Sequence, residues 1–427
     1  MRIRITNGKL VNPRGESQGD ISICDGKIEK IGEPFGEYDR VIDAKGLVVT
    51  PGLIDMHVHL REPGYEYKET ILSGTRAAVK GGFTAVACMP NTNPVADNET
   101  VVTYILSQAQ KAGYAKVYPI ACITKGQQGE DITEFGRLKE AGAVAFSDDG
   151  RPVMDSGIMR LALQYGKGFD ALMISHSEDL TLLNGGVMNE GDTATAIGLK
   201  GITRAAEEVM QSRDIILART YDARVHLAHI STKGAVELVR RAKAEGVKVT
   251  AETAPHYFTA DDTWVIGYDT NTKVNPPLRT KEDVAAIKAG LADGTIDAIA
   301  TDHAPHHEDE KNVEYDIAAN GISGIESSLP LSLNLVREGV ISLEHMVELL
   351  SCTPAEILGV EGGVLKEGAA ADITIFDPGA KYTYTKESMI SKGKNSPYLG
   401  MEMQGKAVYT IVDGKILLDG GKVAEHD

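Results

Sequence analysis

The chain has 427 residues, and its 44 Lys and Arg against 61 Asp and Glu give a formal net charge of −17 with histidine neutral. This length allows two or three domains, or one barrel of roughly 250 residues with an accessory unit. A hydrophobic content of 42% with 25% charged residues excludes an intrinsically disordered chain. The acidic balance argues against a nucleic-acid or anionic-membrane partner, because both require a basic surface.

The cysteines and the N-terminus indicate the compartment. The four cysteines are scattered without a C-x-x-C pair, which favours reduced thiols over disulfides or a Cys-based zinc site. The first 12 residues lack the apolar core of a signal peptide. No apolar run approaches the roughly 20 residues that span a bilayer. The sequence therefore predicts a soluble, cytoplasmic protein with no membrane contact.

The two ends of the chain share a hairpin pattern. Asn7-Gly8, Asp25-Gly26 and Asp413-Gly414 each lie between short stretches that alternate apolar and polar residues. Such pairs favour two-residue hairpin turns, because both residues can take positive φ. Each end is small for a core of its own. Residues 1–52 and 360–427 are therefore predicted to form one composite β-sandwich domain, and two unrelated β extensions are the alternative.

The middle of the chain alternates short apolar segments with longer segments of helical spacing. The predicted strands are Thr50–Leu60, Phe83–Met89, Lys116–Cys122, Gly142–Ser147, Ala171–His176, Arg224–Ile230, Val247–Thr253 and Ile296–Thr301. The predicted helices include Lys68–Lys80, Thr203–Thr220, Thr232–Glu245 and Lys281–Ala292. Strands joined by helices indicate an α/β fold with a parallel sheet, and eight strands close a (β/α)8 TIM-type barrel. Residues 53–359 are assigned to this barrel. An open doubly wound sheet competes, but no Gly-rich phosphate motif follows the first strand.

Histidines and aspartates follow the ends of five predicted strands. In a (β/α) barrel these ends meet at the active-site face. The residues concerned are His57 and His59, Asp148 and Asp149, His176, His229, and Asp302. Taken singly, each has an ordinary structural explanation, since a strand-end histidine is usually a hydrogen-bonded core residue and an aspartate there a helix N-cap.

Their convergence predicts a metal centre. Imidazole and carboxylate ligands without thiolate suit Zn²⁺, and Mn²⁺, Co²⁺ and Fe²⁺ also accept them. One tetrahedral ion uses four ligands. Four histidines and two aspartates, one of them from the Asp148-Asp149 pair, are therefore better explained by two ions that share a bridging carboxylate.

Motifs along nearly the whole chain point to one family. The segment Pro51-Gly52-Leu53-Ile54-Asp55-Met56-His57-Val58-His59 resembles the signature of the amidohydrolase superfamily. The following Leu60-Arg61-Glu62-Pro63-Gly64 makes this region resemble the cyclic amidohydrolases, and the dihydroorotase family in particular. Further matching segments are Met89–Thr92, Phe146–Gly150, His176–Asp179, His229–Thr232, Asn275–Arg279, Ala300–His306 and Gly368–Ile373.

The resemblance implies two Zn²⁺ ions per subunit. His57, His59 and Asp302 would hold the more exposed ion, and His176 and His229 the other. Allantoinase and dihydropyrimidinase relatives bridge the ions with a carboxylated lysine after the fourth strand. This chain has Asp148-Asp149-Gly150 there. The bridging role is assigned to Asp149, and Asp148 stays open as the adjacent alternative.

The resemblance also implies the substrate contacts. N-carbamoyl-L-aspartate and L-dihydroorotate are anions, and arginine is the side chain best suited to a carboxylate. The implied substrate-binding residues are His59, Arg61, Asn91, Asn275, His306, Asn320 and Gly321. Without the family pattern, Arg61 is equally well explained by a surface salt bridge with Glu62, and Asn91 by a turn. Relatives commonly have Pro-Phe-Gly before the second Gly of the late substrate loop, and this chain has Ala318-Ala319-Asn320-Gly321. A different packing is therefore expected in the long, charged loop 307–321.

The implied activity is the reversible cyclisation of N-carbamoyl-L-aspartate to L-dihydroorotate in de novo pyrimidine (UMP) biosynthesis. The metal pair would generate hydroxide, and Asp302 would act as general base and then general acid. An allantoinase or dihydropyrimidinase-type enzyme is one alternative. A non-catalytic scaffold subunit of aspartate transcarbamoylase is another, although the filled ligand set argues against it. The expected partners are the small-molecule substrate, a second copy in a homodimer, and aspartate transcarbamoylase.

Overall fold

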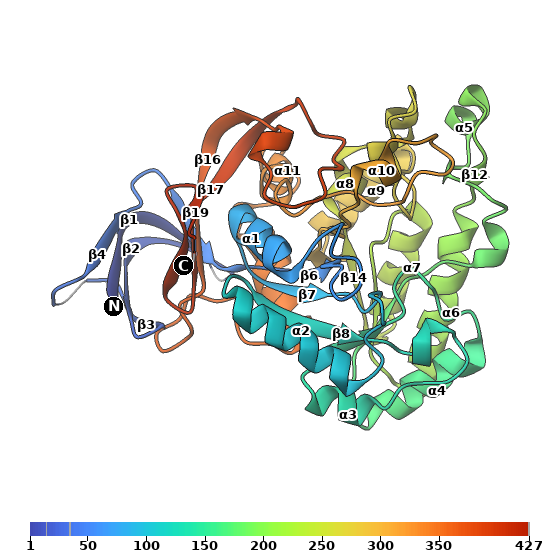
Figure 1. Cartoon of the computed structure of the whole chain (residues 1–427), viewed down its shortest axis with the longest axis horizontal. Helices are drawn as coiled ribbons and strands as arrows, with labels where there is room; N and C mark the ends of the chain where they lie inside the picture. Colours follow the sequence, from blue (N-terminus) through green and yellow to red (C-terminus); the bar gives the residue numbers. More distant parts are fainter. Residues whose placement is uncertain (14, 34–35, 426–427) are drawn as a thin grey trace.

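The computed structural model describes residues 1–13, 15–33 and 36–425. It contains a barrel made from the middle of the chain and a separate, mostly antiparallel sheet made from both ends (Figure 1). In Figure 1 the blue N-terminal and red C-terminal strands lie side by side on the left, and the barrel lies on the right. The predicted combination of a (β/α)8 barrel with a β unit from both termini is confirmed.

The barrel strands are short and mostly buried. They are β6 Leu53–Val58, β7 Phe83–Cys88, β8 Lys116–Ala121, β9 Ala145–Ser147, β10 Met173–Ser175, β13 Val225–Leu227, β14 Val249–Thr253 and β15 Ala298–Ile299. Within the described residues these eight strands pair in the order β15-β14-β13-β10-β9-β8-β7-β6. Val58 then forms a bridge with His303, and the His59 N–H donates to the His303 carbonyl at 2.8 Å. The sheet therefore nearly closes on itself.

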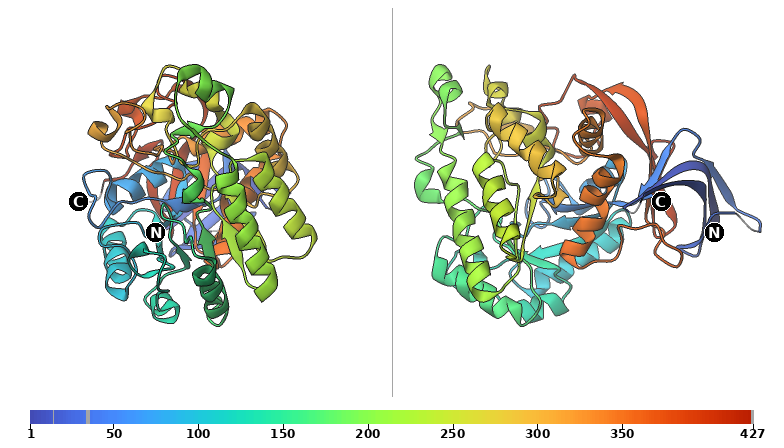
Figure 2. Two further views of the ribbon diagram at one scale, coloured as in Figure 1. Left: turned by 90° about the vertical axis from the view of Figure 1, so that its right-hand side faces the viewer. Right: turned by 180° about the vertical axis from the view of Figure 1, so that it is seen from behind.

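Helices form an outer layer around these strands (Figure 2). The longer ones are α1 Ile71–Gly81, α2 Glu99–Ala112, α4 Ser156–Lys167, α6 Ala205–Tyr221, α7 Lys233–Ala244, α9 Lys281–Ala292 and α11 Ser328–Arg337. The shorter ones are α3 Phe135–Glu140, α5 Asp192–Ile197, α8 Pro255–Thr259, α10 Glu308–Lys311, α12 Leu343–Val347 and α13 Thr353–Leu358. No helix in the described part of the chain is long and apolar enough to cross a membrane.

Capping side chains set the helix boundaries. The Thr70 and Thr280 hydroxyls each accept a backbone N–H in a capping box, so α1 and α9 begin directly after them. The bounds of α9 match the predicted helix Lys281–Ala292. In contrast, α1 begins later than the predicted Lys68, because Thr70 caps it and the preceding residues run through the barrel mouth.

Both ends of the chain form one continuous sheet. Its strands are β1 Arg2–Asn12, β2 Gly15–Cys24, β3 Lys27–Ile31, β4 Arg40–Asp43, β5 Val48–Pro51, β16 Ile373–Thr383, β17 Glu402–Val412, β18 Lys415–Asp419 and β19 Lys422–Val423. The N-terminal and C-terminal parts join where β5 pairs with β16, for example Val49 with Ile375. The strands are thus hydrogen-bonded as a single sheet with its own apolar cluster, which includes Ile3, Ile23 and Ile411. The alternative of two unrelated β extensions is wrong.

The remaining strands, β11 Met188–Asn189 and β12 Gly201–Ile202, form a small sheet of their own. The domain boundaries at residues 52 and 360 stay a prediction, and residues 426–427 lie outside the described part of the chain.

The first predicted barrel strand, Thr50–Leu60, is two strands in the structure. β5 ends at Pro51 in the terminal sheet, and β6 begins at Leu53 in the barrel. A Cβ at Gly52 would lie 2.0 Å from the Thr84 hydroxyl oxygen, so glycine is needed where the chain passes from one sheet to the other. The apolar run continues through this crossing, which explains why its pattern predicts a single strand.

Candidate metal centre and substrate cavity

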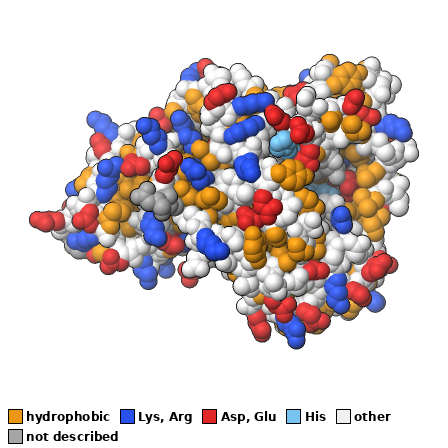
Figure 3. Space-filling view, viewed as in Figure 1, with side chains coloured by type: hydrophobic (Ala, Val, Ile, Leu, Met, Phe, Trp, Pro, Cys, Tyr) orange, Lys and Arg blue, Asp and Glu red, His pale blue; other side chains and the backbone are white. Residues whose placement is uncertain are grey.

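The C-terminal ends of the barrel strands bring the six predicted metal ligands together. His57 lies in β6 and His59 follows it, while Asp149, His176, His229 and Asp302 follow β9, β10, β13 and β15. All six side chains are buried. Acidic and basic side chains are interspersed over the face seen in Figure 3, and histidine is visible beside a hollow there.

Asp149 lies at the centre of this group. Its Oδ1 is 3.5 Å from His57 Nε2, 3.4 Å from His176 Nδ1 and 3.5 Å from His229 Nε2. Its Oδ2 is 3.5 Å from His59 Nε2. Asp149 Oδ1 and His57 Nε2 are buried and have no hydrogen-bond partner. Unpaired polar atoms are rare in a protein interior, so this arrangement fits a cation-binding group.

Asp302 completes the second part of the group. Its Oδ1 is 3.1 Å from His59 Nε2 and 3.5 Å from His57 Nε2. The ligand atoms of His57, His59 and Asp302 lie within 4.8 Å of one another, and so do those of His57, Asp149 and His229. His176 lies beside the latter set, with its Nδ1 2.8 Å from His229 Nε2. The donor atoms suit a metal cofactor, because they are imidazole nitrogens and carboxylate oxygens.

Asp148, the alternative to Asp149, is engaged elsewhere. Its carboxylate accepts the N–H groups of Ile123 at 2.8 Å and Thr124 at 3.1 Å, and the Thr124 hydroxyl also donates to it. Burial raises the pKa of Asp148 to about 6, although these hydrogen bonds oppose the shift. Asp148 therefore joins two loops of the barrel mouth, and Asp149 is the carboxylate beside the histidines.

Glu252 in β14 is a buried carboxylate that the sequence analysis did not single out. Its Oε1 is 2.6 Å from His57 Nδ1, and its Oε2 is 3.2 Å from His226 Nε2. Burial would raise the pKa of Glu252, but the charge of His57 and the hydrogen bonds of both histidines outweigh it and lower the pKa to about 2. An ionised Glu252 accepts the His57 Nδ1–H and leaves the Nε2 lone pair for a metal. Glu252 lies near the end of a predicted strand, so its position in the sequence could have identified it as a candidate site residue.

We expect Glu252→Gln to weaken metal binding by about 10- to 100-fold, since a neutral amide supports His57 less well than a carboxylate. The measurement is competition for the metal between the purified protein and a chelator. Glu237→Gln, on the outside of α7, is the matched control and should bind metal as the unmodified chain does. An unchanged affinity in Glu252→Gln would show that Glu252 does not support the ligand set.

A cavity of about 180 Å³ opens beside the ligands. Its walls include all the predicted substrate residues, namely His59, Arg61, Asn91, Asn275, His306 and the loop Asn320–Gly321. Asp149, His176, His229 and Asp302 also line it. Segments that are far apart in sequence thus meet at one polar cavity, and predicted metal ligands form part of its wall.

Arg61 is half-buried in the wall of this cavity. Its Nε donates to the Pro305 carbonyl at 3.2 Å, and its Nη2 lies 3.3 Å from His306 Nε2. Burial lowers the pKa of Arg61, against the opposing effect of Asp302 and other carboxylates, but a guanidinium remains charged. The alternative of a surface salt bridge with Glu62 is wrong, because the Glu62 carboxylate instead accepts the Ile71 N–H at 2.8 Å and the Tyr104 hydroxyl at 3.0 Å.

The other predicted substrate residues are held by polar contacts. Asn91 Oδ1 lies 2.9 Å from His59 Nδ1 and so orients that ring. His306 Nε2–H donates to the Asn320 carbonyl at 2.7 Å, which joins the loop after β15 to the late loop. Asn275 Oδ1 is buried and unpaired, which leaves an acceptor for a ligand.

Comparisons with known proteins agree with this geometry. Residues 46–235 match the family described as dihydro-orotase-like, and residues 190–418 match the amidohydrolase family. The curated dihydroorotase of Geobacter sp. (strain M21) is 55% identical over 99% of this chain and 100% of its own length. That of Geotalea daltonii (strain DSM 22248 / JCM 15807 / FRC-32) is 56% identical over 98% of this chain and 99% of its own.

Solved structures share the whole fold. The L-hydantoinase (dihydropyrimidinase) from Arthrobacter aurescens superposes with a TM-score of 0.90 at 26% identity, over 99% of this chain and 97% of that one. A D-hydantoinase superposes with a TM-score of 0.85 at 25% identity, over 99% of this chain and 96% of that one. Identity to the dihydroorotases is far higher, over almost the full length of both chains. The chain is a hydrolase of the amidohydrolase superfamily and belongs to the dihydroorotase family.

Proposed function

We propose that the chain catalyses the reversible cyclisation of N-carbamoyl-L-aspartate to L-dihydroorotate in de novo pyrimidine biosynthesis. The observation that carries this proposal is the cavity in which a half-buried arginine, Arg61, lies together with the predicted metal ligands. A guanidinium in the wall of such a cavity attracts an anion, and both proposed ligands carry a carboxylate that does not react. The curated dihydroorotases at 55% and 56% identity support the same activity.

Two zinc ions are the proposed cofactor. His57, His59 and Asp302 would hold one ion, His176 and His229 the other, and Asp149 would bridge them. The buried, unpaired atoms of His57 and Asp149 and the absence of thiolate from the described ligand set support this assignment. Bound there, the metal supplies Lewis acidity at the scissile carbonyl and activates water near neutral pH.

Asp302 is the proposed general base and acid. It lines the cavity and lies beside His59, at the base where the reacting bond of a bound substrate would lie. In hydrolysis it takes a proton from the attacking water and returns it to the leaving ring nitrogen. In cyclisation the order reverses, so it takes the proton from the attacking carbamoyl nitrogen and gives it to the departing water.

The remaining cavity residues bind and orient the substrate. Arg61, Asn91 and His306 would hold the non-reacting carboxylate, because all three line the cavity and a guanidinium is the best donor to a carboxylate. Asn275 and the backbone at Asn320–Gly321 would read the pyrimidine ring. A neutral ring such as dihydrouracil would leave the charge of Arg61 without an anion, which disfavours the hydantoinase-type alternative despite its shared fold.

The test is the cyclisation of N-carbamoyl-L-aspartate by metal-depleted protein before and after addition of Zn²⁺. We expect activity to disappear with the metal and to return with zinc. Allantoin and dihydrouracil are assayed in parallel and should be turned over far more slowly. If N-carbamoyl-L-aspartate is not turned over either with or without zinc, the proposal is refuted. Faster turnover of allantoin or dihydrouracil would favour the alternative enzymes.

Three further expectations also stay proposals. They are a homodimer, association with aspartate transcarbamoylase, and a cytoplasmic location. Sedimentation of the purified chain, alone and mixed with aspartate transcarbamoylase, measures the first two directly.

A further inference from the structure

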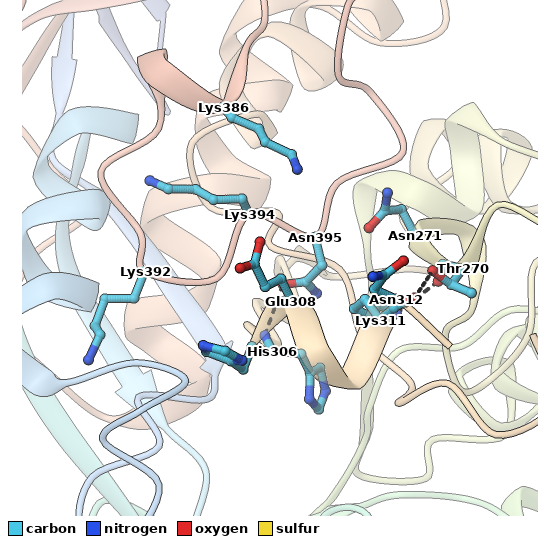
Figure 4. A pocket seen from close by; sticks show the side chains of 11 residues that line it. Thr270, Asn271, His306, Glu308, Lys311, Asn312, Lys386, Lys392, Lys394 and Asn395 are labelled. Carbon is cyan, nitrogen blue, oxygen red and sulfur yellow. Dashed lines mark hydrogen bonds between the residues drawn. The ribbon is translucent and has the colours of Figure 1, made fainter. Parts of the chain in front are cut away.

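A segment that lies between two strands of the terminal sheet in the sequence reaches the mouth of the barrel. Residues 389–396, here called the crossing segment, are part of the connection between β16 and β17. Figure 4 shows Asn395 of this segment beside His306, at an outer cavity of about 600 Å³. His306 lines both this outer cavity and the substrate cavity. The crossing segment therefore lies directly behind one wall of the substrate cavity.

Two buried carboxylates hold the crossing segment in place. Glu326 accepts the N–H groups of Ile390 at 2.9 Å and Ser391 at 3.0 Å. Glu69 accepts the Lys392 N–H at 3.2 Å and the Ser391 hydroxyl. Buried carboxylates are tolerated when such donors satisfy them, so these bonds give the crossing segment a defined path.

Asn395 links this segment to the substrate cavity through its side chain. Its Oδ1 accepts the His306 N–H at 2.9 Å and the Ser323 hydroxyl at 2.9 Å. Its Nδ2 donates to the Ala304 carbonyl at 3.0 Å and the Gly321 carbonyl at 2.9 Å. The side chain is only 4% exposed, and both amide hydrogens and both oxygen lone pairs are used. One amide thus joins the loop after β15 to the Asn320–Gly321 loop.

Gly393 provides a second, independent contact. A Cβ at this position would lie 2.6 Å from Pro305 Cβ and 2.7 Å from the His306 nitrogen. The backbone of the crossing segment therefore packs directly against Pro305 and His306. Since the Pro305 carbonyl accepts the Arg61 Nε–H, this packing also supports the arginine.

We infer that Asn395 and Gly393 are positioning residues, which set the spacing of Arg61, His306 and Gly321 for the substrate carboxylate and ring. They act through these residues, and neither lines the substrate cavity itself. The terminal sheet thereby contributes to substrate binding through the crossing segment. This inference rests on the proposed function, because the spacing matters only if these groups bind the substrate.

Asn395→Asp is the first test. The substitution keeps the shape and both acceptors, but it removes two donors and places an anionic oxygen beside the Ala304 and Gly321 carbonyls. We expect the KM for N-carbamoyl-L-aspartate to rise about tenfold or more with a much smaller change in kcat, because the affected contacts hold non-reacting parts of the substrate. Zinc content should stay unchanged. Asn312→Asp, at an exposed position of the same outer cavity, adds the same charge and should leave both constants unchanged.

Gly393→Ala is the second test and adds no charge. The methyl group must separate the crossing segment from Pro305 and His306, so the same rise in KM is expected. It decides the question if Asn395→Asp does not fold. A lowered Tm with KM and kcat within about twofold of the unmodified chain would show a purely structural role and overturn the inference. Equal effects of Asn395→Asp and Asn312→Asp would overturn it too. Failure of the proposed function looks different, because the unmodified protein itself would then not turn over N-carbamoyl-L-aspartate.

Discussion

Asp302→Asn is expected to lower the turnover of N-carbamoyl-L-aspartate by about 10²- to 10⁴-fold, the usual contribution of a general base and acid. The amide matches the carboxylate in volume, but it cannot take up and return the proton. Asp302 has a left-handed backbone conformation with φ of 47°, which asparagine also tolerates, so the fold should be retained. Initial rates in both directions, with circular dichroism on the same samples, measure the effect.

Zinc content separates the two roles proposed for Asp302. A rate defect with full zinc content supports proton transfer, while a defect that tracks metal loss supports only ligation. Asp309→Asn, at an exposed position in α10, also replaces one carboxylate by an amide and is the control. A near-normal rate for Asp302→Asn would rule out the proposed role.

His176→Ala is expected to remove about one of the two proposed zinc ions per subunit and to abolish turnover. His176 Nδ1 lies 3.4 Å from Asp149 Oδ1 and 2.8 Å from His229 Nε2, so its loss leaves one side of the ligand set incomplete. Elemental analysis of the purified variant gives the zinc content, and thermal unfolding shows whether the barrel persists.

His345→Ala serves as the matched control for this substitution. His345 lies in α12 and contacts Glu348 and the Leu291 carbonyl, away from the substrate cavity. The His345→Ala variant should keep both the zinc content and the turnover rate of the unmodified chain. If His176→Ala keeps the same zinc content as this control, His176 is not a metal ligand.

The barrel was predictable because its signals are local. Buried parallel strands appear as short apolar runs, and amphipathic helices show a period of 3.6 residues, so both are visible without knowledge of distant contacts. Helix α9 begins at its predicted residue because Thr280 caps it. The boundary between β5 and β6 at Gly52 was not predictable in the same way. The apolar run continues from the terminal sheet into the barrel, and only the close approach of Thr84 to Gly52 marks where one strand ends and the next begins.

Only part of the candidate site could be predicted from the residues at the strand ends. His57, His59, His176 and His229 were identifiable because the topology of a (β/α) barrel brings strand ends to one face. Asp148 and Asp149 were not separable, because the difference lies in the hydrogen bonds that Thr124 and Ile123 give to Asp148. Glu252 was overlooked among ordinary strand residues, although it contacts both His57 and His226.

By itself, the sequence determined the barrel, the composite nature of the terminal sheet, the ligand types and the family resemblance. Each depends on residue type and spacing, which are properties of the linear chain. Only the tertiary structure decided which aspartate lies among the histidines, which carboxylate contacts His57, and which loops the Asn395 side chain joins. These contacts join residues that are far apart in sequence. Whether their hydrogen bonds form depends on differences of a few tenths of an ångström in the donor–acceptor distance, which no local pattern encodes.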